Sequence, residues 1–243
     1  MSLVVNFSLF LVLIFTLNFF RNHIAHFLQR ISLLFFRTPV PGVIFYSIFF
    51  LIGVTIHELS HLLTAEILGV RTGRIRIFPE EIKSGNMRLG SVESVAADPF
   101  REALIGAAPF LLGLTLITLI VSTQFGYLSS LDFNLWFTSL TPVKVFLLYL
   151  LFSITNTMYV SKEDQRAWWI LPIVFVLIGA TIYVFNIAFT QIFPVIVSYL
   201  KIINFALFVC LLLDLIVICA LWFGQRVGET FTGTRVVYKQ NSQ

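Results

Sequence analysis

Apolar segments long enough to cross a bilayer constrain this chain more than any other feature of its sequence. A membrane-crossing helix needs about 20 mostly apolar residues, and six segments approach that length. They cover residues 3–20, 41–68, 103–121, 142–158, 169–189 and 203–223. Charged residues make up only 12% of the chain, against roughly 25% in soluble domains. We therefore predict an all-α polytopic membrane protein with about six transmembrane helices and the lipid bilayer as a partner.

The apolar segments divide the chain into three parts. Residues 1–40 hold the first transmembrane helix and a short amphipathic stretch, His26–Phe36, which we expect at the interface. Residues 41–168 hold three transmembrane helices, and residues 169–243 hold two more and a polar tail. Lys and Arg gather in two of the loops and in the tail, so the positive-inside rule assigns both termini to the cytoplasm. The positive charge thus indicates topology and no nucleic-acid partner.

The loop after the second apolar segment has the pattern of β-structure. Gly73–Pro79 and Met87–Val95 both alternate apolar and polar residues, and Lys83–Asn86 between them has the composition of a turn. We expect a small β-hairpin over residues 73–95 at the cytoplasmic face. The edges of a hairpin carry unpaired backbone groups, so this element can accept another strand.

The run His57-Glu58-Leu59-Ser60-His61, inside the second apolar segment, is an HExxH motif. Residues i and i+4 of a helix share a face, so both imidazoles can bind one metal ion. Such ligands suit zinc, and Glu58 can take a proton from a metal-bound water. Chance matches are expected at a frequency on the order of 0.002, and ionisable groups inside a membrane are costly unless paired or ligated. The sequence therefore predicts one Zn²⁺ ion in the cytoplasmic half of this helix.

Two histidines leave zinc one protein ligand short, and carboxylates are the candidates. They are Glu66, Asp98, Glu102, Asp164 and Asp214. Glu66 lies about 140° round the helix from the second histidine and faces away. Asp214 also fits a polar contact inside the bundle, and the two acids before the third segment fit a helix start. Asp164 shares the membrane side of the motif, although its surroundings, SKEDQR, also fit a solvated loop.

Four features occur in a fixed order along the chain. HExxH is followed by a basic hairpin with Ile77-Phe78-Pro79, then by the small-residue run Glu102–Pro109, and then by Asn156 with Asp164 eight residues later. In this order and spacing they resemble the site-2 proteases, a family of intramembrane zinc metalloproteases. The resemblance covers about Pro41–Arg166, which would form a three-helix catalytic core.

The resemblance implies hydrolysis of a peptide bond in or near a transmembrane segment of a membrane-anchored substrate protein. The default expectation for the location is a prokaryotic cell membrane. The resemblance also implies a role for each matching residue. These roles are zinc binding by His57, His61 and Asp164, general base catalysis by Glu58, and substrate contact by Asn156, Gly106 and Pro109.

The chain also departs from the family pattern. The Pro expected three residues after Asn156 is Tyr159, and the expected Leu-Asp-Gly is Glu163-Asp164-Gln165. Two other functions therefore stay open. One is a membrane metalloprotease of the prenyl-peptide-processing type, which takes its third ligand from a Glu on a later helix. The other is an inactive protease-like scaffold or metal-binding protein, although the intact Glu58 favours an enzyme.

Overall fold

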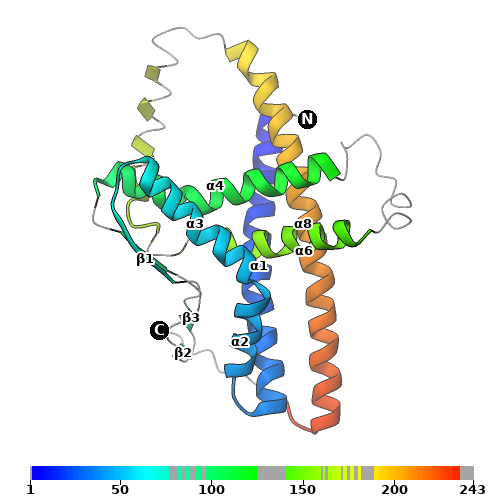
Figure 1. Ribbon diagram of the computed structural model, residues 1–243. Coiled ribbons are helices and arrows are strands. Elements are labelled where there is room, and N and C mark those ends of the chain that lie inside the picture. Colours follow the sequence, from blue (N-terminus) through cyan, green and yellow to red (C-terminus); the bar gives the residue numbers. More distant parts are fainter. Residues whose placement is uncertain are drawn as a thin grey trace.

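The computed structural model describes residues 2–76, 82–83, 86–87, 91–94, 97–124, 141–159, 161, 164–170, 172–173, 176–177, 180–181 and 189–235. Its helices are α1 (Leu3–Phe36), α2 (Val40–Phe49), α3 (Leu51–Ile67), α4 (Pro99–Gln124), α6 (Pro142–Thr157), the 3-10 helix η1 (Trp168–Ile170) and α8 (Phe189–Thr232). Its strands are β1 (Thr72–Arg76), β2 (Ile82–Lys83), β3 (Asn86–Met87) and β4 (Ser91–Ser94). The described chain is therefore mainly helical, as Figure 1 shows.

Among the described residues, three helices are long and apolar enough to cross a membrane, namely α1, α4 and the Phe193–Thr232 part of α8. Helices α2 and α3 form a fourth possible span, bent by 66°. Helix α6 is apolar but has only 16 residues. These helices are typical of a membrane protein, and they account for up to four of the six predicted spans. The predicted span over 169–189 lies largely outside the described residues.

Two boundaries predicted from the sequence are wrong. Helix α1 continues without a break to Phe36, so His26–Phe36 is the last third of one helix and no separate interfacial segment. Helix α8 begins at Phe189 and includes Gln191–Lys201, which we expected to separate two spans. The physical reason is tertiary packing, since α1 and α8 lie against each other over much of their lengths and stabilise helix that hydropathy alone does not require.

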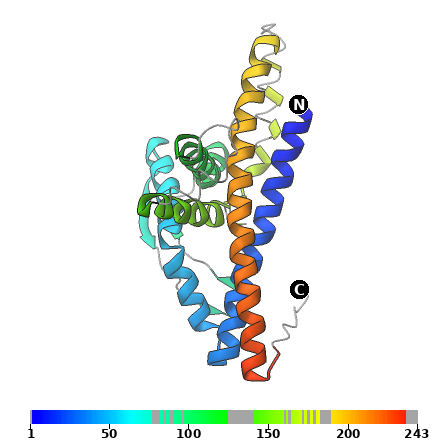
Figure 2. The same cartoon turned by 90° about the vertical axis from the view of Figure 1, so that its right-hand side faces the viewer.

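Helices α1 and α8 run in the same direction. Near one end the Asn204 side-chain amide donates a hydrogen bond to the carbonyl of Asn6 over 2.9 Å. Near the other end Gly228 packs against Leu34 and Phe35. The N-terminal end of α1 and the C-terminal end of α8 therefore lie at opposite ends of the pair (Figure 2). If this pair crosses the bilayer, these two ends lie on opposite sides, against the sequence expectation of two cytoplasmic termini.

Helices α4 and α6 lie across the α1–α8 pair in Figure 1, and Figure 2 views both nearly end-on. Helix α3 packs against α4 and α6, so these three form one layer and the α1–α8 pair forms the other. The hydrophobic core lies where the layers cross. Its fully buried members include Leu17 of α1, Ile117 of α4, Leu151 of α6 and Leu207 of α8.

The bend between α2 and α3 is held by packing on both sides. The Phe50 ring is buried, with its centroid 4.3 Å from that of Tyr46 and 5.4 Å from that of Phe152. The hydroxyl of Tyr149 on α6 donates a 2.6 Å hydrogen bond to the carbonyl of Phe49, next to the break. Helix α2 itself packs on α1. The predicted second span is therefore two helices that belong to different layers.

Along the chain, two antiparallel strand pairs come between α3 and α4. β1 pairs with β4, with Ile75 opposite Val92, and the register shifts between Thr72 and Ile75. β2 pairs with β3, with Ile82 opposite Met87. Both pairs fall in the segment where the sequence predicts a hairpin, residues 73–95. Residues 77–81, 84–85, 88–90 and 95 lie outside the described part of the chain.

Candidate metal centre

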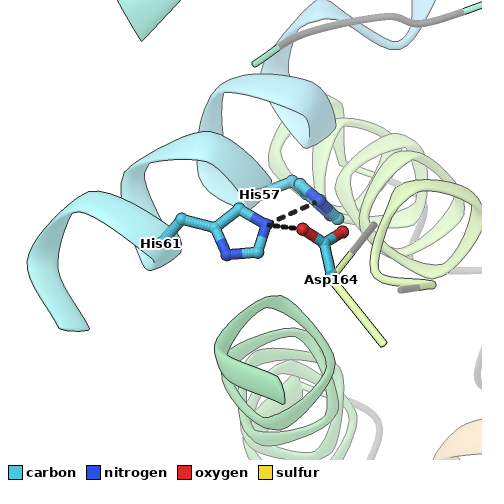
Figure 3. Close-up of side chains that lie close together, drawn as sticks. All are labelled: His57, His61 and Asp164. Atoms are coloured by element: carbon cyan, nitrogen blue, oxygen red, sulfur yellow. Dashed lines mark hydrogen bonds and ion pairs between the residues drawn. The ribbon is translucent and has the colours of Figure 1, made fainter. Parts of the chain in front are cut away.

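His57, His61 and Asp164 lie together, with their side chains directed toward one another (Figure 3). The Nε2 atoms of the two histidines are 3.2 Å apart, and Oδ1 of Asp164 is 3.6 Å from Nε2 of His61. One ligand atom from each residue lies within 4.8 Å of the other two. Within the described residues, this is the group of His, Cys, Asp and Glu side chains that has the geometry of a metal site.

Helix α3 supplies both histidines, one turn apart on the face that packs toward α4 and α6. Gly53, one turn before His57, allows α3 to approach α6 closely. Its amide N–H donates to Ser153 Oγ over 3.1 Å, and a Cβ at this position would lie 2.6 Å from the Ser153 carbonyl oxygen. A larger residue would separate the two helices that bring the cluster together.

Both imidazoles are oriented by backbone carbonyls. His57 Nδ1 lies 2.7 Å from the carbonyl oxygen of Thr157, the last residue of α6. His61 Nδ1 lies 2.8 Å from the carbonyl oxygen of Ile105 in α4. A carbonyl can only accept, so each Nδ1 carries the hydrogen and donates it. In a neutral imidazole the Nε2 atom is then an acceptor, which is the form that binds a metal.

Asp164 is oriented by Ser161, three residues earlier. Its Oδ2 accepts hydrogen bonds from the Ser161 backbone N–H over 3.0 Å and from the hydroxyl over 2.5 Å. Its other oxygen, Oδ1, faces the histidines. The sequence analysis did not identify Ser161, although a Ser three residues before an Asp is a common local side-chain-to-backbone pattern.

Gly106 packs directly against the backbone of the Asp164 segment. A Cβ at Gly106 would overlap the carbonyl oxygen of Asp164, so only glycine lets α4 approach the segment this closely. Pro109 is buried in the interior of α4. Both residues were expected to contact substrate. Gly106 packs beside Asp164, and Pro109 comes four residues after Ile105, whose carbonyl contacts His61. The substrate contacts of both residues stay predictions.

The structure does not bring Asn156 to the metal cluster. Its side chain is 1% exposed and is directed into the bundle. There Nδ2 donates to Oδ1 of Asp214 over 2.8 Å and to the Phe152 carbonyl over 2.9 Å. Asp214 is also 1% exposed. The side chain of Asn156 thus makes a buried contact between α6 and α8, and its expected contact with substrate stays a prediction.

The other carboxylates considered as third ligands lie elsewhere. Glu66 is exposed on α3. Asp98 accepts hydrogen bonds from the backbone N–H groups of Phe100 and Arg101 at the start of α4, and Glu102 accepts one from Ala97. These two acids thus have the helix-start role that the sequence also allowed.

Glu58 is 5% exposed, and its side chain is not among the three clustered ligand groups. The cluster is more open on the Asp164 side, since the Asp164 side chain is 23% exposed and that of His61 is 9% exposed.

The arrangement of acceptors has the geometry of a site for a metal ion, with all three ligand atoms within 4.8 Å of one another. With both Nδ1 atoms donating to carbonyls, two imidazole nitrogens and a carboxylate oxygen face one another. A single added proton would turn one of these three acceptors into a donor and so satisfy one pair of them. A metal cation would interact with all three acceptor atoms at once. Tetrahedral ligands about 2.1 Å from zinc lie about 3.4 Å apart. The observed 3.2 and 3.6 Å lie on either side of that value.

Comparisons of the chain with protein-family models, with characterised proteins and with solved structures find no match. The chemistry of this chain is therefore argued from its motif and from the geometry of its metal cluster.

Proposed function

We propose that this protein is an intramembrane zinc metalloprotease that hydrolyses a peptide bond in or near a transmembrane segment of a membrane-anchored protein. The observation that supports this most directly is the convergence of three metal-ligand atoms on an HExxH helix, with both histidines held in the metal-binding tautomer. The site-2 protease resemblance supplies the reaction, and the cluster supplies a matching ligand set.

The ligands would be His57, His61 and Asp164. A zinc ion bound there supplies Lewis acidity, which polarises a peptide carbonyl and lowers the pKa of a water molecule. Glu58, next to His57 on α3, accepts a proton from the attacking water and returns it to the leaving amine. A carbon–oxygen bond forms, the carbon–nitrogen bond breaks, and the enzyme ends in its starting protonation state.

Water must reach the site, because the bilayer core contains none. The open side at Asp164 provides a route. Exposed arginines lie near the ends of the elements that build the site, namely Arg71 after α3, Arg101 in the first turn of α4 and Arg166 after Asp164. Under the positive-inside rule these arginines assign the site to the cytoplasmic side of the membrane.

The identity of the third ligand bears on the alternatives. A protease of the prenyl-peptide-processing type takes its third ligand from a Glu on a later helix, whereas here the clustered carboxylate belongs to Asp164. A scaffold or metal-binding protein has no need of a base beside the ligands. The cluster together with Glu58 therefore supports the intramembrane protease over both alternatives.

The experiment that tests the proposal measures metal and activity on the same detergent-purified samples. Zinc content is determined by mass spectrometry for the wild type, His57→Ala, Asp164→Ala and Glu58→Gln. Cleavage is followed with fluorescently labelled casein, an unfolded chain that needs no helix unwinding. We expect about one zinc per wild-type and Glu58→Gln chain and loss of zinc in the ligand variants. Cleavage by Glu58→Gln should fall by about 10²–10⁴-fold.

Each negative result has a separate meaning. A wild type without metal contradicts the metalloprotease proposal as a whole. A wild type with zinc that cleaves no faster than Glu58→Gln contradicts catalysis and leaves a metal-binding scaffold. Retention of zinc by Asp164→Ala shows that the third ligand is a different residue.

A further inference from the structure

A proline in the interior of α4 lies directly behind the metal cluster. Pro109 is the tenth residue after the helix begins at Pro99, and α4 continues to Gln124. A proline at such a position removes one helical hydrogen bond, and its ring presses on the carbonyl four residues earlier. Both effects destabilise a helix. Pro109 therefore destabilises α4 locally, and a contact outside the helix can offset that cost.

The affected carbonyl is the one that holds a metal ligand. Four residues before Pro109 is Ile105, whose carbonyl oxygen lies 2.8 Å from Nδ1 of His61. With any other residue at position 109, the backbone N–H there would donate to this same oxygen. Because proline has no N–H, the Ile105 carbonyl keeps that lone pair for the imidazole. The proline ring also tilts the carbonyl away from the helix axis, toward a partner outside the helix.

The contact determines which nitrogen of His61 faces the cluster. A hydrogen bond from Nδ1 to Ile105 fixes the ring with Nε2 directed toward His57 and Asp164 (Figure 3). Such outer contacts fix the tautomer and the ring orientation of a ligating histidine. His57 obtains the same contact from Thr157, whose carbonyl is free because α6 ends there. His61 faces the middle of α4, where Pro109 leaves the Ile105 carbonyl without the helical N–H that would otherwise donate to it.

We propose that Pro109 is a positioning residue for the metal ligand His61, because it leaves the Ile105 carbonyl without a helical donor and available to the imidazole. This inference rests on the metal site of the proposed function. This role is separate from the substrate contact that the resemblance implies for Pro109, which stays a prediction.

The test compares Pro109→Ala with Pro194→Ala. Pro194 also lies inside a helix, α8, which contributes none of the clustered ligand groups. For each detergent-purified protein, zinc affinity is measured by competition with a chelator, the visible spectrum is recorded with Co²⁺ as the probe, and the melting temperature is taken without metal.

We expect Pro109→Ala to bind zinc about 10-fold more weakly, within the 10–100-fold range typical of a lost outer contact. Its Co²⁺ bands should change in position or intensity, because the ring of His61 is no longer fixed. Its metal-free melting temperature should stay equal or rise, because alanine restores the helical hydrogen bond. Pro194→Ala should keep the wild-type zinc affinity and Co²⁺ spectrum.

A Pro109→Ala protein with wild-type zinc affinity and Co²⁺ spectrum overturns the proposal. So does a parallel fall of affinity and metal-free melting temperature, since that pattern means a packing role only. Failure of the proposed function is distinct, because it appears as a wild type that binds no zinc, and Pro109 then has no metal ligand to position.

Discussion

The metal cluster and the Asn156–Asp214 pair are both polar groups inside an apolar bundle, and they differ in how their atoms are satisfied. In the metal cluster, Nδ1 of each histidine and Oδ2 of Asp164 have hydrogen-bond partners, and the remaining acceptors converge. In the pair, one amide N–H group joins the two side chains directly. Among the described residues, Asn156 Oδ1 and Asp214 Oδ2 are buried without a partner.

This difference separates a binding site from a structural contact. The metal cluster is partly exposed, and its converging lone pairs could hold a cation from outside the chain. The pair is fully buried and joins α6 to α8, so its main effect is on how the two layers of the bundle hold together. Burial of an ionisable residue is therefore not enough to identify the reactive centre. The number of lone pairs that converge on one accessible point is more informative.

The largest expected effect is the contrast between the two aspartates. Asp164→Ala should weaken zinc binding by at least about 100-fold, more than the loss of an outer-shell partner, because it removes a ligand. Asp214→Ala should change zinc affinity by less than about 10-fold, since Asp214 contacts Asn156 and is not one of the clustered ligands. Chelator competition measures both. Equal losses of zinc affinity in the two variants would show that the Asn156–Asp214 pair also belongs to the metal site.

The second effect concerns the contact that shapes the metal cluster. Gly106→Ala inserts a Cβ into the Asp164 carbonyl, so the Asp164 segment must move. We expect zinc affinity to fall about 10-fold, as for a disturbed ligand shell. The matched control is Gly224→Ala on α8, where an added Cβ has no neighbour within 4 Å. That control should raise helix stability by up to about 1 kcal/mol and leave zinc affinity unchanged.

The third prediction addresses stability through the buried pair. Asn156→Leu leaves the Asp214 carboxyl buried without its donor and should lower the free energy of unfolding by about 1–3 kcal/mol. Thermal unfolding in detergent measures the loss. The double variant Asn156→Leu/Asp214→Leu should recover most of it, because removal of both polar partners can be nearly neutral. A double variant that is less stable than Asn156→Leu would show that Asp214 has further partners.

The smallest expected effect is that of Asp214→Asn. The new side chain keeps an oxygen to accept from Asn156 and loses only the charge, so we expect a change in stability of about 1 kcal/mol or less. Zinc affinity and casein cleavage should match the wild type. If cleavage is lost while stability and zinc affinity are kept, the pair takes part in proton transfer and is not a structural contact only.

The sequence predicted the three clustered side chains better than the backbone groups that orient them. His57 and His61 are one helical turn apart, so their shared face follows from helix geometry alone. The clustered position of Asp164 agrees with its predicted membrane side. The carbonyls of Thr157 and Ile105 could not be predicted, because every residue has one and only the packing of α3 against its neighbours selects these two.

The direction of Asn156 and the length of α1 also depend on distant contacts. Asn156 is directed to Asp214, 58 residues later in the chain, and no local pattern encodes that pairing. Helix α1 extends to Phe36 against α8, whereas hydropathy alone suggested an end near residue 20. The sequence thus specified chemistry that is local in the chain, and long-range packing decided the rest.

The break at Phe50 has a mechanical consequence. Helix α2 belongs to the layer of α1, and helix α3 belongs to the layer of the ligands, so the bend at Phe50 is a joint where the chain passes from one layer to the other. A change in bilayer thickness or lateral pressure that tilts α1 and α8 loads α2 first. Strain reaches His57 and His61 through that joint, seven residues before the first ligand. Tension in the membrane could therefore adjust the spacing of the ligands without a molecule touching them.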